Sequence, residues 1–217
     1  MLDNRTILQG WTFLLVVPAL ISGLFFGLYF YFPKILDRTN KSAQTETTSI
    51  AEPRRLEDFS LVDHHGHIFD NQRLKGHWTF MNFGCTHCPD TYSTTLSAMS
   101  EVSSRLHALE KHAPFQMVFV SIDPVRDTLA RLSEYVTDFD ADFLGVTGTE
   151  SDLPRLTHPL GIPYHPMETR NNSMDYAEDH TTSIILIDPQ GRFFADFLPP
   201  YTPETIVQDF LAITHQG

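Results

Sequence analysis

The chain has 217 residues and a formal net charge of −12, with 15 Lys and Arg residues against 27 Asp and Glu residues. Binding to nucleic acid requires clustered basic residues for phosphate contacts, so this charge argues against a nucleic-acid partner. The length accommodates one globular domain and one additional segment. Because the chain has only two cysteines, it cannot form a multi-disulfide scaffold, and the role of these cysteines must be local.

The N-terminal part of the chain is apolar. After a short tail, residues 1–6, no charged residue occurs between Arg5 and Lys34. About 20 apolar residues span a bilayer core, so residues 7–33 are predicted to form one transmembrane helix that anchors the protein. A cleaved signal peptide is the alternative, but its apolar region is typically ~7–15 residues long. The aromatic residues at positions 29–32 favour a retained helix that ends at a membrane interface.

The charges around this run do not fix its orientation. Arg5 precedes the run and three basic residues follow it by position 41, so the positive-inside rule does not favour a cytoplasmic N-terminus. A long domain can translocate regardless of charge, and we expect the domain to lie outside the cytoplasmic membrane. Residues 34–54 are polar and without periodicity, which predicts a flexible linker. Residues 55–217 are then the folded domain.

The first half of the domain predicts a hairpin followed by alternating strands and helices. The hairpin is expected over residues 59–70, with a glycine turn. Apolar runs predict buried strands over 78–84 and 115–123. Apolar residues at helical spacing over 96–109 predict a helix that starts just after the cysteines, and a second helix is expected over 129–139.

The second half predicts a third strand over 143–147, a brief helix over 151–161 and a long loop over 163–182. Two antiparallel strands around a Pro-Gln-Gly turn are expected over 183–198, followed by a C-terminal helix that starts near Thr202. The order is a hairpin, then βαβαβ, then ββα. This order predicts an α/β fold of the thioredoxin-like kind, in which helices flank a central mixed sheet.

Three histidines, His64, His65 and His67, crowd the predicted hairpin turn. Alternate residues of a hairpin point to opposite faces, so at most two of these rings could share a metal ion. Their position in a turn favours exposed polar residues over a metal site.

Both cysteines lie where a predicted strand turns into a predicted helix. Cys85 and Cys88 have the spacing Cys-x-x-Cys. The partial positive charge and free N–H groups of a helix N-terminus stabilise thiolate, which is both a nucleophile and a ligand for soft metals. The position therefore suits redox exchange or copper binding. A purely structural disulfide is a weaker alternative, because a loop this small constrains little of the unfolded chain.

Four segments resemble the SCO/SenC family and follow one another in the order found in that family. Residues 83–90 resemble its F-G-(F/Y)-T-x-C-P-D segment, and residues 121–128 are similar to its S-(V/I)-D-P-x-R-D-T segment. Residues 145–149 resemble G-L-T-G-T. Residues 179–191 resemble D-H-(S/T) followed by an L-(I/V)-D-P-x-G strand.

The resemblance implies a thioredoxin fold and a copper-binding protein. Members of the family are anchored in the inner membrane of bacteria or mitochondria and assist assembly of the copper centre of cytochrome c oxidase. They bind copper through two cysteines and one histidine, here Cys85, Cys88 and His180, as Cu(I) or Cu(II). The implied partner is the copper-bearing subunit of the oxidase or another periplasmic copper protein. The implied location is a single-pass inner-membrane protein with its soluble domain in the periplasm.

The chain departs from the family at its cysteines. The family motif is C-x-x-x-C-P, whose first cysteine matches Cys88 and whose second falls on Tyr92. Cys85 instead occupies a position where the family usually has an aromatic residue. One interpretation is that Cys85, Cys88 and His180 still converge on one copper ion, because thiolates suit Cu(I) and an imidazole also suits Cu(II).

The other interpretation is a dithiol/disulfide pair of the thioredoxin-like redox kind, which would make the protein a thiol–disulfide oxidoreductase. Cys85 is then the expected attacking thiol, and His87 is expected to favour thiolate rather than to bind metal. Asp123 and Arg126, which follow a predicted strand, are expected to form a turn and an ion pair.

Overall fold

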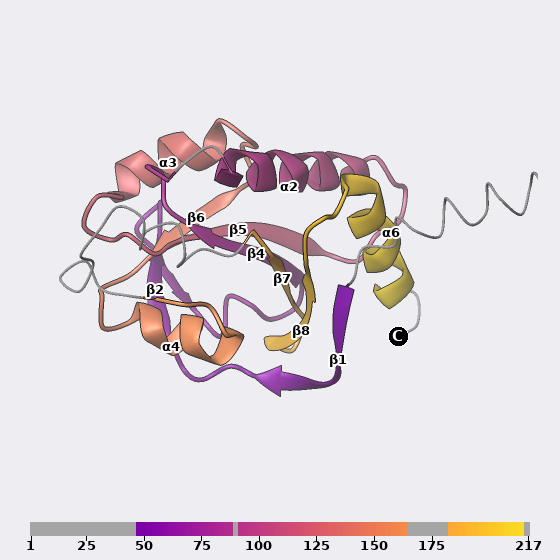
Figure 1. Cartoon of the computed structure of the whole chain (residues 1–217), viewed down its shortest axis with the longest axis horizontal. Helices are drawn as coiled ribbons and strands as arrows, with labels where there is room; N and C mark the ends of the chain where they lie inside the picture. The colour runs from indigo at the N-terminus through magenta and orange to yellow at the C-terminus, as the bar shows by residue number, and fades with distance from the viewer. Residues whose placement is uncertain (1–46, 89–90, 165–181, 215–217) are drawn as a thin grey trace, which may run out of the picture. The chain divides into compact units, whose positions relative to one another are not determined.

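The computed structural model describes residues 47–88, 91–164 and 182–214 (Figure 1). The chain separates into two compact units, Met1–Gln44 and Thr45–Gly217, and all described residues belong to the second. Within the described ranges, no helix has the length and apolar character needed to cross a membrane. The predicted anchor at residues 7–33 lies outside these ranges.

One mixed sheet of eight strands forms the centre of this unit, in the order β1-β8-β7-β4-β5-β6-β2-β3 (Figure 1). Its middle strands β4, β5 and β6 run parallel, whereas the other neighbouring strands pair antiparallel. Their continuous apolar runs are typical of strands that are covered on both faces. The strands are β1 (Thr47–Arg55), β2 (Ser60–Asp63), β3 (Ile68–Asp70), β4 (Trp78–Gly84), β5 (Phe115–Ser121), β6 (Leu144–Thr147), β7 (Ile184–Ile187) and β8 (Arg192–Phe197).

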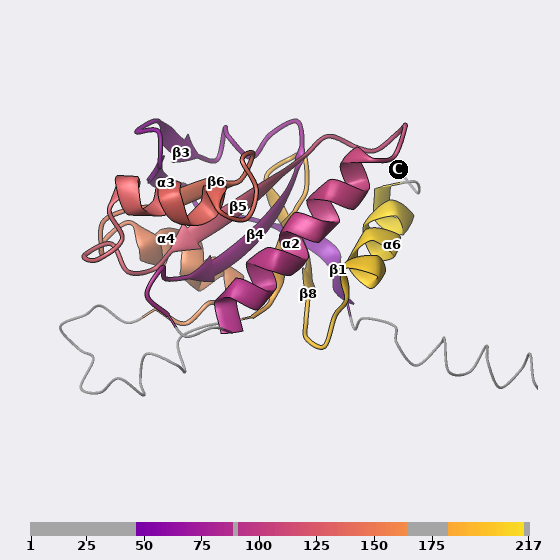
Figure 2. The ribbon, with the colours of Figure 1, turned by 90° about the horizontal axis from the view of Figure 1, so that it is seen from above.

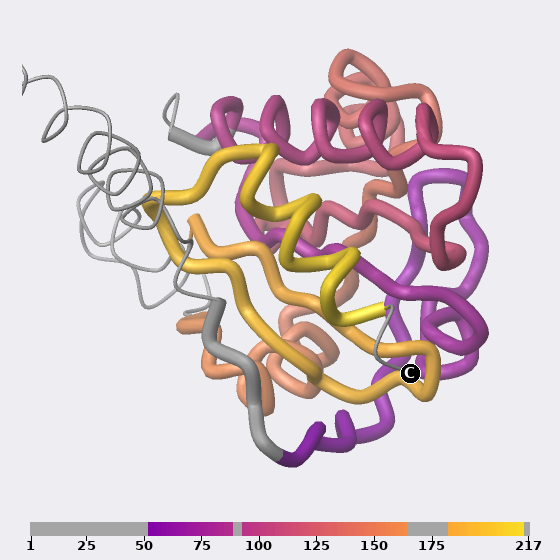
Figure 3. The backbone as a smooth tube through the Cα atoms, turned by 90° about the vertical axis from the view of Figure 1, so that its right-hand side faces the viewer, coloured from indigo at the N-terminus to yellow at the C-terminus, as the bar shows by residue number. Residues whose placement is uncertain are grey.

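Helices cover both faces of the sheet (Figures 1 and 2). One face carries α2 (Thr91–His107), α3 (Leu129–Thr137) and α6 (Pro203–Thr214), which pack on side chains such as Phe80 and Phe119. Figure 3 shows α6 lying alongside α2. The other face carries α4 (Leu153–Thr157) and the short 3₁₀ helix η1 (His158–Leu160).

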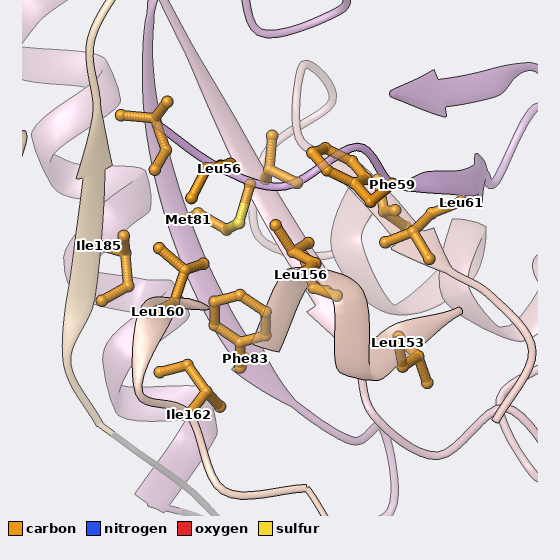
Figure 4. Close-up of a cluster of buried hydrophobic side chains, with 14 of the residues drawn as sticks. Leu56, Phe59, Leu61, Met81, Phe83, Leu153, Leu156, Leu160, Ile162 and Ile185 are labelled. Carbon is orange, nitrogen blue, oxygen red and sulfur yellow. The ribbon is translucent and has the colours of Figure 1, made fainter. Parts of the chain in front are cut away.

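The core on the α4 face lies directly beneath the strand that precedes the cysteines. Met81 and Phe83 alternate along β4 and point to this face, where Leu156 and Leu160 pack against them (Figure 4). All four side chains are buried. The end of β4 is therefore fixed by packing, which gives the residues after it a rigid starting point.

The order of elements confirms the expected hairpin, βαβαβ and ββα arrangement. Two boundaries differ. Strand β1 covers part of the predicted linker at 34–54 and pairs with β8, so the folded domain begins before the expected residue 55. The second difference is at the C-terminal end of α2. The helix stops at His107, and Leu109, which was expected on its apolar face, is 38% exposed.

Candidate dithiol site

The two cysteines follow the central strand of the sheet directly. Strand β4 ends at Gly84, which pairs with Ser121, the last residue of β5, and the carbonyl of Gly84 accepts the N–H of Ile122 at 2.9 Å. The carboxyl ends of neighbouring parallel strands meet at one edge of an α/β sheet, which is where such folds place their sites. The segments after β4 and β5 therefore lie side by side.

Cys85 and Cys88 are joined by a disulfide, with their Cα atoms 5.2 Å apart. The N–H of Cys88 donates to the carbonyl of Cys85 at 3.3 Å, which closes a tight turn. Cys85 is fully buried, whereas Cys88 is partly exposed. An incoming thiol would therefore meet Cys88 first. Cys85 was expected to be the attacking thiol, but nucleophilic attack requires access to the sulfur, so this difference in burial favours Cys88 for that role.

A buried carboxylate holds the residues between the cysteines. Asp127 is 1% exposed and lies in the segment between β5 and α3. Its Oδ2 accepts the N–H of Thr86 at 2.9 Å and the hydroxyl of Ser121 at 2.6 Å. Its Oδ1 accepts the hydroxyl of Thr86 at 2.7 Å. A carboxylate only accepts hydrogen bonds, so these donors match what an ionised Asp127 can satisfy.

His87 joins the same network from the exposed side. Its Nδ1 lies 3.2 Å from Asp127 Oδ1 and 3.0 Å from Thr86 Oγ1. The Thr86 hydroxyl already donates to Asp127, so a proton on Nδ1 is the arrangement that supplies both contacts. The His87 side chain is 45% exposed, in contrast to Asp127.

The helix that follows Asp127 contributes a cation to the site. Thr128 caps α3 by accepting the N–H of Arg131 at 3.2 Å, as its position in the sequence indicates. The Nε atom of Arg131 donates to Thr86 Oγ1 at 3.3 Å. In the preceding turn, Arg126 pairs with the buried carboxylate of Asp123, which confirms the expected ion pair. The loop of the disulfide is thus tied to both β5 and α3.

From the sequence, Asp127 is a candidate cap of the helix that follows it and is not predicted to contact the cysteine loop, although a signal for this contact exists. Residues 121–128 follow a strand that was predicted to be parallel to the strand before Cys85. Parallel neighbours place their following segments at one edge of the sheet. A polar side chain a few residues after Ser121 could therefore have been expected beside the cysteines.

The predicted ligands are only partly covered by the structure. His180 lies outside the described residues. Tyr92, at the position of the family's second cysteine, lies in α2, and Cys85 precedes that helix. Among the residues that the structure describes, no group of three or more His, Cys, Asp or Glu residues could hold a metal ion.

The histidines of the hairpin have structural partners. His64 donates its backbone N–H to the carbonyl of Gly145 at 2.7 Å, and its Nδ1 accepts the N–H of Gly145 at 2.9 Å. Buried Asp63 accepts the N–H groups of His65 and His67 at 3.0 and 2.9 Å. His65 and His67 are exposed, as expected, but His64 is partly buried. Burial is the main cause that lowers the pKa of His64, and the neighbouring His65 lowers it further.

Comparison with known proteins assigns the family. The mixed sheet with flanking helices matches thioredoxin-like Sco structures. Yeast Sco1 with copper bound superposes with a TM-score of 0.68 at 27% identity, over 76% of this chain and 91% of that chain. Bradyrhizobium japonicum ScoI with copper bound superposes with a TM-score of 0.58 at 32% identity, over 72% and 98% of the two chains.

The SCO1/SenC family model matches residues 47–215, and the chain belongs to this family. A mitochondrial SCO2 homologue of Bos taurus is 31% identical over 179 residues, which cover 82% of this chain and 66% of the relative. An SCO2-like protein of Rickettsia conorii is 34% identical over 152 residues, which cover 70% of this chain and 73% of the relative. The match begins at Thr47, the first residue of β1, which agrees with the earlier start of the folded domain.

Proposed function

We propose that this protein binds copper and assists assembly of the copper centre of cytochrome c oxidase. It belongs to the SCO1/SenC family, and Sco proteins of yeast and B. japonicum with this fold have been solved with copper bound. The observation that carries the proposal is that both thiols of the chain stand together at the carboxyl end of β4. Thiolate is the ligand type that soft Cu(I) prefers, so this pair suits copper as cargo.

We propose Cys85, Cys88 and His180 as the copper ligands, of which the imidazole also suits Cu(II). The carbonyl of Thr182, two positions after His180, accepts the hydroxyl of Tyr201 at 2.6 Å, and the same hydroxyl lies 3.1 Å from the hydroxyl oxygen of Thr95 in α2. Residues two positions apart are separated by at most about 7 Å. The chain next to His180 is thus tied to the helix that follows the cysteines.

A second described contact supports this ligand set. The side-chain amide of Asn82 donates to the carbonyl of Ser183 at 3.1 Å. Asn82 precedes Cys85 by three positions, and Ser183 follows His180 by three positions. Ser183 thus lies beside the strand that precedes the cysteines. This position favours the convergence of Cys85, Cys88 and His180 on one ion.

A thiol–disulfide oxidoreductase is the second candidate, and the observation that favours it is the Cys85–Cys88 disulfide itself. The partly exposed Cys88 gives an external thiol access to the bond. The two functions are compatible, because the disulfide must accept two electrons before the cysteines can bind copper as two thiolates.

We further propose that residues 7–33 anchor the protein in the cytoplasmic membrane, with residues 34–46 as a linker and the domain in the periplasm. The support is the uncharged apolar run and the family to which the domain belongs. The copper-bearing subunit of cytochrome c oxidase, or another periplasmic copper protein, is then the partner.

Titration of the reduced protein with Cu(I) against a chromophoric competitor tests the copper proposal. We expect one copper per chain, and a loss of affinity of roughly tenfold or more in Cys85→Ser, Cys88→Ser and His180→Ala. His158→Ala is the matched control, because His158 is exposed on η1, on the α4 side of the sheet. Millimolar binding, or binding that His180→Ala leaves unchanged, would contradict the proposal.

A further inference from the structure

We propose that Asp127 is the positioning residue of the Cys85–Cys88 pair and sets its reduction potential. The inference rests on the proposed role of this pair. The hydrogen bonds of Asp127 given above go to Thr86, His87 and Ser121 and not to either sulfur. Asp127 acts through the two residues between the cysteines, Thr86 and His87.

The contacts of Asp127 fix both residues of that loop. Thr86 is held by its N–H and by its hydroxyl, and His87 is held by Nδ1. The same carboxylate accepts the hydroxyl of Ser121, at the end of β5. One buried side chain therefore connects the loop between the cysteines to the rigid centre of the sheet.

A loop that is fixed in this way favours the disulfide. In a Cys-x-x-Cys pair the two intervening residues determine how often the sulfurs meet after reduction. Fixing them raises the effective concentration of one thiol toward the other, because less conformational freedom is lost when the bond closes. Release of the loop would make ring closure less favourable and the reduction potential less negative.

The charge of Asp127 acts in the same direction. A carboxylate close to the pair disfavours a second negative charge on a cysteine. Replacement by Asn removes this charge and introduces an NH₂ group, which donates and cannot accept the bonds that Thr86 and Ser121 make. Both effects of Asp127→Asn favour the reduced form.

Redox equilibration of the full-length protein with dithiothreitol, in the absence of copper, tests the proposal. One reductant thiolate forms a mixed disulfide with one cysteine and releases the other. The second thiolate of the same dithiothreitol molecule then attacks the mixed disulfide, which forms the cyclic disulfide of the reductant and releases the first cysteine. Two electrons and two protons pass from the reductant to the cysteines. We expect Asp127→Asn to shift this equilibrium about tenfold toward the dithiol, which corresponds to roughly 30 mV.

Asp188→Asn is the matched control. Asp188 is a buried carboxylate that accepts the N–H groups of Gln190 and Arg192 and pairs with the Arg192 side chain in the β7–β8 turn. That turn lies at the opposite end of β4 from Cys85, because Ile187 pairs with Thr79. This control measures how far the redox equilibrium shifts when a buried carboxylate far from the cysteines is lost, that is, through an effect on folding alone. An Asp127→Asn shift no larger than that of the control would overturn the proposal.

A double-mutant cycle that combines Asp127→Asn with Thr86→Val tests whether Asp127 acts by positioning the loop or independently of Thr86. This change removes the hydroxyl that Asp127 accepts and keeps the N–H. If Asp127 acts through the loop, the two shifts in potential will be less than additive. Additive shifts would overturn positioning. Because the assay contains no copper, it is independent of the titration that tests copper binding.

Discussion

Reduction of the Cys85–Cys88 disulfide should cost the domain only modest stability. The bond joins residues with a sequence separation of 3, so it closes a very small loop. The chain-entropy model gives about 2 kcal/mol for such a loop at 25 °C. In a domain of this size the corresponding decrease in Tm is roughly 4–8 °C. The hydrogen bonds that Thr86 donates to Asp127 do not require the sulfur–sulfur bond and should hold the loop after reduction.

Urea unfolding of the oxidised and reduced protein, followed by circular dichroism, measures this difference. The Cys85→Ser/Cys88→Ser double variant is the control, since its unfolding should not respond to reductant. Loss of cooperative unfolding after reduction, or a decrease in the free energy of unfolding above about 5 kcal/mol, would show that the bond is a structural staple. The functional interpretation of the pair would then be refuted.

Two further predictions follow from burial and from the hairpin histidines. With an excess of a small disulfide, Cys85→Ser should form a mixed disulfide at Cys88 at least about tenfold faster than Cys88→Ser forms one at buried Cys85, and mass spectrometry of timed samples measures both rates. Equal rates would contradict the assignment of Cys88 as the accessible thiol. The pKa of His64 is lowered from 6.5 in the folded protein, so stability should decrease as the pH falls from about 6.5 through the folded-state pKa. His64→Asn keeps an acceptor for the Gly145 N–H without a titrating ring, and the difference between its urea midpoints at pH 7.5 and 5.5 should be smaller than in the wild type. An unchanged difference would show that another group causes the pH dependence.

The parallel centre of the fold could be predicted from the sequence because its signals are local. Burial is indicated locally by the apolar runs of β4 and β5 and by the helical spacing of the apolar residues in α2. Strand β1 has no such signal. It is polar, contains Pro53 and pairs only with β8, with a shift in register between Ser49 and Arg54. Proline and polar residues are tolerated at sheet edges and irregularities, so this segment resembles a linker in sequence.

Part of the site could also be predicted, because some of its signals are local in the sequence. The Cys-x-x-Cys spacing and its place after a strand are visible in the sequence. The contacts of Asp127 with Thr86 depend on residues 41 positions apart and appear only when β4 and β5 are placed side by side. The burial of Cys85 also depends on tertiary packing, and therefore the difference in accessibility between the two cysteines could not be predicted from the sequence.

X-ray absorption spectroscopy of the Cu(I)-loaded, full-length protein tests the central proposal most directly. We expect two sulfur ligands and one nitrogen ligand on copper, with loss of the nitrogen contribution in His180→Ala and of one sulfur in Cys85→Ser. A copper environment with a single sulfur, or a spectrum that His180→Ala leaves unchanged, would contradict it.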